Sequence, residues 1–543
     1  MNTLNATIGA LPVYESGIEE KILKLFPAAE AAEEANMEME AETSAIVRRF
    51  LSAEQFSSPI RYKDLADKFT ESTISSEPRS MSIYLESLET KVVKHSTNTG
   101  SPRFIGHMTS QLPGFVGPLA KLIAAINQNM VKAETAKAAT PHERQAIAMI
   151  HRLVFGASES FYREHIQNIE STLGVISSGG TLANLHALWC ARNKALASHS
   201  RSGGVEVDGM ASILQERGFQ DAVIIGSALM HYSLEKAAGL MGLGTRNLVR
   251  VPVDGFNRVD CRLMRAAVER ARANRQAVIA LVGVAGTTDT GAIDLLHEIA
   301  DLAEEFGIHF HVDAAWGGPT LFSRRHQHKL KGIDRADSVI FDGHKQLYLP
   351  VGVGISIFKD PTMARMVEKQ ASYIIRPNSV DLGRRTIEGS RVNAALYLHA
   401  GLNLIGESGY EYLIDQGINK AAYLARKVKS MPEFELLVQP EINIVVYRYI
   451  PKCLRENAAA GTLSENENQI INQCNTALQK MQRQRGLSFV SRTMLRGVSP
   501  VPNQTLVVLR AVLSNPLTTT EDIDAVLEEQ VEIGATVSSF LQI

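Results

Sequence analysis

Short runs of apolar, often β-branched residues alternate with helical patterns through the middle of the chain. Four such runs lie at residues 222–226, 277–286, 309–315 and 338–343, and an amphipathic helical pattern at 295–307 separates two of them. Buried strands that alternate with amphipathic helices are typical of βαβ units. The pattern therefore predicts an α/β domain with a mostly parallel sheet.

The two ends of the chain have different patterns. Residues 1–100 are polar and helix-prone, with many glutamates, which indicates helices with solvated faces. After residue 400 come a helical pattern at 402–428, a strand pattern at 443–450, a polar stretch at 457–468 that we interpret as a surface loop, and a strand at 505–513. We therefore expect a helical N-terminal segment (1–100), a large domain (101–395) and a smaller C-terminal α+β domain (396–543).

Composition narrows the classes of partner. Lys and Arg total 56 and Asp and Glu total 58, so the net charge of −2 creates no long-range field for nucleic acid or an anionic membrane. Residues 1–14 lack the pattern of a secretory signal, and no run of ~18 apolar residues could span a bilayer. Four cysteines, none at CxxC spacing, indicate neither a metal site nor a disulfide framework. We expect a cytoplasmic protein that binds small molecules or copies of itself.

Residues with chemical function follow the predicted strands, where an open parallel sheet binds its ligands. Gly179, Gly180 and Thr181 precede a helical pattern, so backbone N–H groups at a positive helix end could bind a phosphate. Alone, a glycine pair before a helix more often marks a tight turn. Asp313 and Lys345 each follow a strand, and on spacing alone a buried ion pair between them has about even odds.

Thr288 and His231 also follow strands of the same predicted sheet. An isolated histidine at such a place is more often a structural residue, but the whole set fits one ligand, an aromatic pyridinium with a phosphate and an aldehyde. That ligand is pyridoxal phosphate. Lys345 would form an imine with the aldehyde, Asp313 would keep the ring nitrogen protonated, and His231 would stack on the ring.

Several motifs occur in a specific order: SSGGTLAN, HYSLEKAAG, AGTTDTGAID, HVDAAWGGP with SRRHQHKLKGI, DGHK and LRAVLSNP. From about residue 102 to the C-terminus the chain resembles the group II pyridoxal-dependent decarboxylases, which include glutamate and cysteine-sulfinate decarboxylases. Its whole-chain character is most similar to the bacterial aspartate 1-decarboxylases that make β-alanine. The resemblance implies a type I pyridoxal-phosphate fold and a homodimer with active sites at the subunit interface.

The resemblance also assigns roles to residues. It implies that Lys345 is the Schiff-base lysine, that Asp313 is the partner of the pyridine nitrogen, and that His231 and Ala315 pack on opposite faces of the ring. Tyr373, on a loop after the lysine, matches the family's proton donor to Cα. The residues placed around the cofactor are Gly180, Thr181, His231, Thr288, Asp313, Ala315, His344 and Lys345, with Gly180, Thr181 and His344 near the phosphate.

Substrate contacts follow in the same way. Arg510 matches the family arginine that binds a substrate carboxylate. His107 stands where the glutamate enzymes have glutamine, which favours a shorter diacid, and Asp342 stands where they usually have asparagine. We expect L-aspartate as the substrate and β-alanine and carbon dioxide as products, with glutamate or cysteine sulfinate as alternatives.

Three other classes of function fit the sequence less well. An aldehyde-forming enzyme of the same fold would share the cofactor residues but lack the loop tyrosine, so Tyr373 argues against it. A nicotinamide dehydrogenase would need a GxGxxG motif that opens a helix, and the chain has none in that context. A binding or scaffold protein would have no need for Lys345, Asp313 and His231 together.

Overall fold

The computed structural model describes residues 22, 25–26, 29–197, 203–371, 375–376, 378–496 and 504–541. The chain forms two compact units, one of residues 1–98 with 484–487 and one of residues 99–483 with 488–543. Both sheets belong to the second unit, so the predicted boundary at residue 395 stays a prediction.

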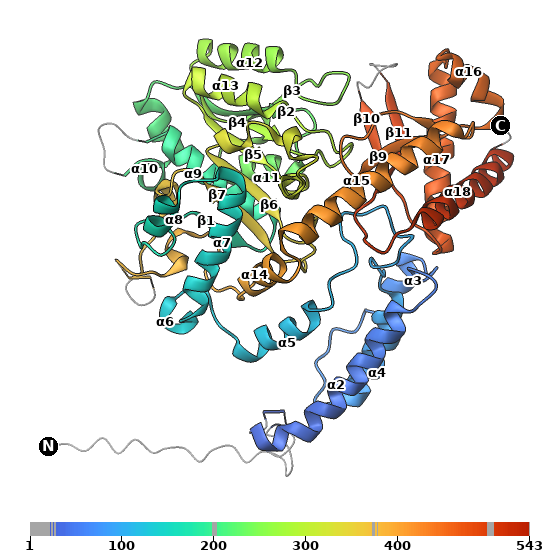
Figure 1. The fold of residues 1–543 in the computed structure, drawn as a ribbon, viewed down its shortest axis with the longest axis horizontal. Coiled ribbons are helices and arrows are strands. Elements are labelled where there is room, and N and C mark those ends of the chain that lie inside the picture. Colours follow the sequence, from blue (N-terminus) through green and yellow to red (C-terminus); the bar gives the residue numbers. More distant parts are fainter. Residues whose placement is uncertain are drawn as a thin grey trace. The chain divides into compact units, whose positions relative to one another are not determined.

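A seven-stranded sheet forms the centre of the second unit, in the order β1-β7-β6-β5-β4-β2-β3 (Figure 1). The neighbours from β3 to β6 pair in parallel, whereas β7 runs antiparallel to both β6 and β1. The expectation of a mostly parallel sheet is confirmed. The strands are β1 (Gly174–Ser177), β2 (Asp221–Ser227), β3 (Leu248–Val251), β4 (Gln276–Val284), β5 (His309–Asp313), β6 (Ser338–Asp342) and β7 (Gly354–Phe358).

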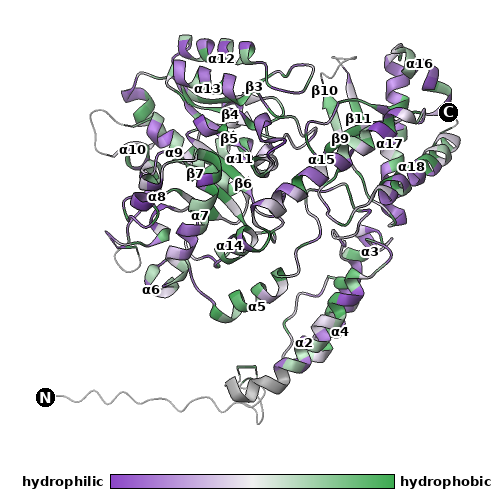
Figure 2. Cartoon of the chain, viewed as in Figure 1, coloured by the Kyte–Doolittle hydropathy of each residue, from purple (hydrophilic) through white to green (hydrophobic). Residues whose placement is uncertain are grey.

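Helices cover both faces of this sheet, which explains why its central strands are apolar on both sides. One core contains buried residues of α7, α12, α13 and α14, and a second contains buried residues of α9, α10 and α11. Figure 2 shows β6 and β7 in green between helices whose outer surfaces are largely purple. The helices of this region are α5 (Val116–Ile126), α6 (Ala133–Ala136), α7 (Ala139–Phe155), α8 (Glu159–His165), α9 (Gly180–Ala195), α10 (Val205–Glu216), α11 (Tyr232–Leu240), α12 (Cys261–Ala273), α13 (Leu296–Phe306) and α14 (Ala395–Leu404).

A smaller antiparallel sheet, in the order β10-β11-β9-β8, follows near the C-terminus, as the α+β pattern predicted. Its helices pack on it through a separate apolar core. The elements are α15 (Gly406–Ser430), β8 (Phe434–Leu436), β9 (Ile444–Tyr449), α16 (Arg455–Ala460), α17 (Glu465–Arg485), β10 (Ser491–Arg496), β11 (Thr505–Val512) and α18 (Thr520–Phe540).

Two local expectations need correction. The helix expected at 402–428 is present but divided between α14 and α15 at Ile405, because Gly406, the first residue of α15, adopts a φ of +69° that a continuous helix does not accommodate. The expected loop at 457–468 is mostly helical. Gly461, with a φ of +67°, ends α16, and the reciprocal hydrogen bonds of Ser464 and Glu467 begin α17.

The first unit is helical, as expected for the N-terminal segment. It contains α2 (Ala29–Leu51), α3 (Tyr62–Ala66) and α4 (Met81–Lys91). Arg49 of α2 makes a two-pronged ion pair with Glu89 of α4, with N···O distances of 2.7 and 2.9 Å. Phe56, between the helices, is buried. None of the described helices is both long enough and apolar enough to cross a membrane.

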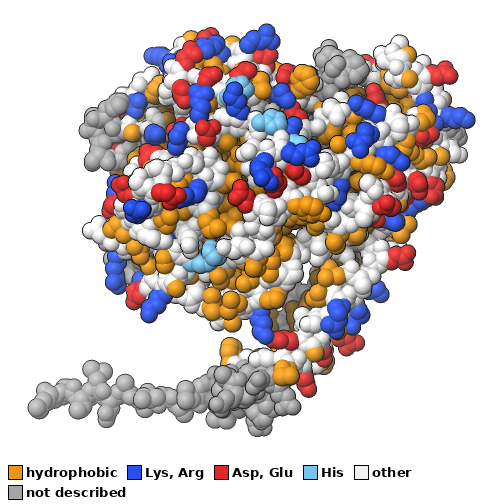
Figure 3. Space-filling model, in the orientation of Figure 1, with side chains coloured by type: hydrophobic (Ala, Val, Ile, Leu, Met, Phe, Trp, Pro, Cys, Tyr) orange, Lys and Arg blue, Asp and Glu red, His pale blue; other side chains and the backbone are white. Residues whose placement is uncertain are grey.

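Charge is mixed rather than segregated on the face that Figure 3 shows, where Lys and Arg lie interspersed with Asp and Glu. This distribution agrees with the small net charge of the chain. That face therefore has no extended surface of purely positive or purely negative charge.

A closed ring of three buried hydrogen bonds joins the small sheet to the large one. Trp316 Nε1 donates to Asn443 Oδ1 at 3.0 Å, Asn443 Nδ2 donates to Gln346 Oε1 at 2.8 Å, and Gln346 Nε2 donates to the Trp316 carbonyl at 2.7 Å. Trp316 follows β5, Gln346 follows β6, and Asn443 precedes β9. The ring therefore fixes the two sheets at the level of the strand ends.

Asn443→Ala should destabilise the protein, because it leaves the Trp316 donor and the Gln346 acceptor buried without partners. We expect a loss of about 2–4 kcal/mol in the free energy of unfolding, measured by denaturant titration. The exposed Asn274→Ala is the control and should change it by less than about 0.5 kcal/mol. Equal effects of the two variants would show that the ring does not hold the sheets together.

Candidate active site

A cavity of about 520 Å³ lies where β1, β2, β4, β5 and β6 end. It is lined by His107, Met108, Ser178, Gly179, Gly180, Thr181, Leu182, Asn184, His231, Tyr232, Thr288, Ala315, Asp342, His344, Lys345 and Arg510. The structure thus brings nearly all the sequence-predicted residues to one place. Asp313 adjoins the cavity through Asn184 and Ala315, and Tyr373 lies outside the described residues.

The first turn of α9 forms one end of the cavity. Gly179 and Gly180 begin this 16-residue helix, so its free N–H groups and the positive end of its dipole face the cavity. A Cβ at Gly180 would lie only 2.6 Å from Asp342 Oδ2, so no side chain fits there. The Ser178 N–H donates to Glu388 Oε2 at 3.0 Å, which shows that this loop attracts anionic oxygen.

Lys345 pairs with Asp342, its neighbour on the same turn, at a distance of 3.1 Å between Nζ and Oδ2. The alternative of a Lys345–Asp313 ion pair is therefore wrong. Asp342 Oδ1 and His344 Nδ1 are both buried without a hydrogen-bond partner. Burial lowers the pKa of His344, and the nearby Lys345 lowers it further against the opposing effect of Asp342. The two atoms lie 3.7 Å from each other, and both residues line the cavity, where a polar ligand could complete their hydrogen bonds.

Asp313, at the end of β5, is only 5% exposed. Its carboxylate accepts hydrogen bonds from Asn184 Nδ2 at 3.0 Å and from the Ala315 N–H at 3.2 Å. Within the described part of the chain no lysine, arginine or histidine forms an ion pair with it. A buried carboxylate is costly without a cation. A protonated pyridine nitrogen of a bound cofactor would supply that cation.

His231 precedes α11 and acts as its N-cap. Its Nδ1 accepts from the Ser233 N–H at 3.3 Å, and the Ser233 hydroxyl lies 2.9 Å from the same nitrogen. Because a backbone N–H can only donate, a neutral His231 carries its proton on Nε2. Burial lowers the pKa of His231, although Asp313 raises it in part, so the ring is neutral and can stack on an aromatic cofactor.

Arg510, on β11, reaches the cavity from the small sheet. Its guanidinium donates to the carbonyls of Thr288 at 2.9 Å and Gly106 at 3.3 Å, whereas Nε is buried with no partner. Burial lowers its pKa from the ordinary arginine value, and Asp289 partly offsets this. A buried guanidinium held by neutral carbonyls retains its full charge for a carboxylate ligand.

His107 lines the cavity close to the same cation. Its Nδ1 accepts from the Thr109 N–H at 3.3 Å, so the neutral ring has its proton on Nε2. Burial lowers the pKa of His107, and the charges of Arg510, His344 and Lys345 lower it further. The histidine is therefore a neutral hydrogen-bond donor beside Arg510.

Several residues that hold these groups were not predicted from the sequence. Asn184 joins Asp313 to the Ser233 hydroxyl, at 3.0 Å in each case, and its Oδ1 contacts His311 Nε2 at 2.8 Å. A signal for His311 exists in the sequence, because it lies two residues before Asp313 and so shares a face of β5 with it. Asn184 and Glu388 carry no such signal, since their contacts cross from other elements.

The arrangement of a large mixed sheet, a small antiparallel sheet, a phosphate-type helix end, a lysine and a buried aspartate defines a pyridoxal-phosphate enzyme of fold type I. The model of the pyridoxal-dependent decarboxylase conserved domain matches residues 65–450. The chain belongs to this family, and its cofactor is pyridoxal 5′-phosphate.

Individual relatives support the assignment to this family. The chain is 42% identical to an aspartate 1-decarboxylase of Aliivibrio fischeri over 95% of this chain and 94% of that protein. It is 28% identical to the acidic amino acid decarboxylase GADL1 of Bos taurus over 67% of each chain. Its fold resembles the crystal structure of mouse CSAD with a TM-score of 0.80 at 24% identity, covering 92% of this chain and 99% of that one.

Gly180→Ala should weaken cofactor binding, because the new Cβ would displace Asp342 and disturb its pair with Lys345. Overpacking of this kind costs about 1–3 kcal/mol, so we expect the dissociation constant of the cofactor to rise roughly tenfold or more. A titration of the apoenzyme followed by visible absorbance measures it.

Gly239→Ala is the matched control, because it lies in α11 with only Thr245 at 4.0 Å from the added Cβ. It should leave cofactor affinity unchanged. Unchanged affinity in both variants would contradict the close approach of α9 and Asp342.

Proposed function

We propose that the protein removes the α-carboxylate of L-aspartate to give β-alanine and carbon dioxide, and so supplies a precursor of pantothenate. The observation that carries this proposal is the 42% identity to an aspartate 1-decarboxylase over almost the full length of both chains. The cavity supports it, because a cation and a neutral donor face the space where a dicarboxylic substrate would bind.

Eight residues would hold the cofactor in this proposal. Lys345 would provide the amine that attaches its aldehyde, and Asp313 would provide the negative charge beside its ring nitrogen. His231 and Ala315 would pack on the two faces of its ring. The phosphate would bind at the first turn of α9, near Gly180, Thr181 and His344, and Thr288 would also contact the cofactor.

When bound, pyridoxal phosphate supplies a ring that accepts the electron pair left behind as carbon dioxide departs. The protein determines which bond of the substrate breaks by orienting it. Arg510 binds a substrate carboxylate, and the N–H of His107 Nε2 donates to a carboxylate held close to it. Because the ring of His107 occupies part of the cavity, a carboxylate that binds to it is held close in, and this favours a short diacid.

Asp342 positions the reactive amine. Its carboxylate lies 3.1 Å from Lys345 Nζ and holds this amine at the cavity wall. Tyr373 remains our proposed proton donor to Cα, on the basis of the sequence resemblance. We also propose that the enzyme works in the cytoplasm as a homodimer with active sites at the subunit interface.

Lys345→Ala tests the central assignment. The variant should lose turnover and the visible absorbance of the attached cofactor, because only this amine forms that bond. The exposed Lys331→Ala should retain both. Carbon dioxide release by Lys345→Ala at a tenth of the parent rate would refute the assignment.

A substrate panel tests the choice of acid. We expect kcat/KM for L-aspartate to exceed the value for L-glutamate by tens to hundreds of fold, because one methylene is worth about 1–3 kcal/mol of discrimination. It should also exceed the value for L-cysteine sulfinate. His107→Gln should reduce this ratio. A value for glutamate or cysteine sulfinate equal to that for aspartate would reject aspartate as the substrate and leave the decarboxylase chemistry intact.

Tyr373→Phe tests the proton donor. The variant should release carbon dioxide slowly and consume oxygen, with aldehyde, ammonia and hydrogen peroxide as products, because the donor to Cα is missing. An oxygen electrode and a peroxide assay measure this outcome. Clean β-alanine formation at the parent rate would remove Tyr373 from the mechanism.

A further inference from the structure

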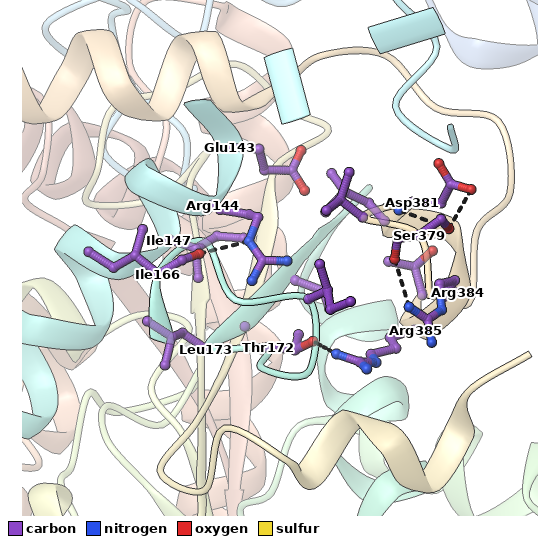
Figure 4. A pocket seen from close by; sticks show the side chains of 16 residues that line it. Glu143, Arg144, Ile147, Ile166, Thr172, Leu173, Ser379, Asp381, Arg384 and Arg385 are labelled. Atoms are coloured by element: carbon purple, nitrogen blue, oxygen red, sulfur yellow. Dashed lines mark hydrogen bonds between the residues drawn. The ribbon is translucent and has the colours of Figure 1, made fainter. Parts of the chain in front are cut away.

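A second, small cavity lies away from the active site, where α7, the segment before β1 and residues 379–386 meet. Figure 4 shows the side chains of Arg144 and Arg385 directed toward each other across it. Its volume is about 30 Å³, which is room for one or two particles the size of a water molecule. Apolar side chains, among them Ile147, Ile166 and Leu173, form the rest of the wall.

Arg385 has an unused donor at this cavity. The residue is 5% exposed; Nε donates to Glu368 Oε2 at 2.8 Å and Nη1 donates to Thr172 Oγ1 at 2.9 Å. Its Nη2 is buried with no hydrogen-bond partner. An unsatisfied charged donor of this kind costs several kcal/mol, unless a ligand or water accepts from it.

Arg144 has no carboxylate partner within the described part of the chain. It donates through Nε and Nη2 to the carbonyls of Ile166, Asn168 and Ser171. Burial lowers its pKa to about 10, and the charge of Arg385 contributes to that shift. The two guanidinium groups therefore repel each other across a space with no acid between them.

The charges around the cavity do not balance. Arg144, Arg384 and Arg385 are three cations, and Glu368 and Asp381 are two anions. The remaining acid, Glu143, is neutralised by Arg391 through a buried two-pronged ion pair. One positive charge is left without a counterion.

We propose that this cavity binds a single halide ion, chloride under ordinary conditions, between Arg144 and Arg385. A monoatomic anion fits the small volume, accepts from Arg385 Nη2 and supplies the missing negative charge. The small volume favours a monoatomic anion over a carboxylate or a phosphate. The ion would fix residues 379–386 against α7 and the start of β1.

The thermal midpoint of the holoenzyme in chloride, compared with gluconate at equal ionic strength, tests the site. Chloride should raise the midpoint by about 2–5 °C, because a ligand of the native state stabilises it. Arg385→Gln and Arg144→Gln should each abolish the chloride effect. The exposed Arg246→Gln should keep it.

Crystals soaked in bromide give a second readout that does not depend on how the variants fold. An anomalous peak in the cavity between the two guanidinium groups is the expected result. A midpoint that does not respond to chloride, together with no bromide peak there, would overturn the proposal and leave water as the occupant.

A different observation carries a second inference, which rests on the proposed role of Asp313. A chain of buried hydrogen bonds runs along β5, from Asp313 at the carboxyl end of this strand to His309 at its amino end. His311 Nε2 contacts Asn184 Oδ1, Ser338 Oγ contacts His311 Nδ1, and His309 Nε2 contacts Ser338 Oγ, each at 2.8 Å. His309 and His311 share a face of β5 with Asp313.

All the protons of this chain point toward Asp313. Asn184 donates its amide to Asp313, so its oxygen must accept the proton of His311 Nε2. Burial lowers the pKa of His311 and His309 to about 3 each, so both rings are neutral. His311 Nδ1 then accepts from Ser338, and Ser338 accepts from His309 Nε2. His309 Nδ1 is left buried without a hydrogen-bond partner, 3.9 Å from Asp337 Oδ2.

We infer that His311, Ser338 and His309 are positioning residues that polarise Asn184 and hold Asp313 as an oriented carboxylate. Aligned dipoles reinforce one another in a buried chain. They favour negative charge at the end to which their protons point. The chain therefore strengthens the group that faces the ring nitrogen of the cofactor, without touching the cofactor.

His311→Phe should lower kcat for aspartate up to roughly tenfold, because it removes the neutral hydrogen bond that polarises Asn184, with KM little changed. It should also shift the pH dependence of the visible absorption of the bound cofactor. His311→Gln, which retains a donor toward Asn184, should recover most of both properties.

A lower thermal midpoint with parent kinetics and absorption in His311→Phe would overturn this inference and indicate a purely structural role. Asp313→Asn separates it from the proposed function. If Asp313→Asn is inactive and His311→Phe is normal, only the positioning chain is rejected. If Asp313→Asn is itself normal, the proposed role of Asp313 fails.

Discussion

The burial of the Asp313 carboxylate is the constraint on which the rest of the site depends. It lies at the end of a strand with apolar layers on both sides, and its protein partners are an amide and a backbone N–H rather than a cation. An anion in such a place is stable only if its hydrogen bonds are oriented and a positive ligand completes it. The fold supplies the first requirement through α9 and β5. In the proposed function, the protonated ring nitrogen of the cofactor would supply the second, and the buried charge would make cofactor binding and site integrity interdependent.

The parts of the fold that were predicted from sequence are those with a periodic signal. The runs at 222–226, 277–286, 309–315 and 338–343 lie on β2, β4, β5 and β6, since buried parallel strands are continuously apolar. The short edge strand β1 and the antiparallel strand β7 were not predicted, because four or five residues that include a glycine and a serine do not distinguish a strand from a turn. The division between α14 and α15 depended on the backbone of Gly406, which composition does not reveal.

The candidate site divides in the same way. Residues that end strands could be brought together from sequence, because strand ends share an edge. The ion-pair and hydrogen-bond partners of these residues could not be predicted from the sequence. Lys345 pairs with Asp342 rather than Asp313, since both lie on one turn after β6, and a turn's geometry is not visible in spacing. Arg510 lies far along the chain from the other residues of the cavity. Only the pairing of β11 with β9 brings it to Thr288.

The segment 379–391 shows why costly buried ion pairs persist in this protein. Replacing such pairs by apolar residues is often neutral for stability, so stability alone does not explain them. Here Arg384 and Arg385 share Glu368, and Arg391 pairs with the buried Glu143 of α7. Between these two fixed points lies Glu388, whose carboxylate reaches the Ser178 N–H beside the first turn of α9. Apolar packing would hold the segment in place but would not set its register along the backbone. Directional ion pairs at both ends set that register, and the position of Glu388 at the cofactor-binding helix follows from it.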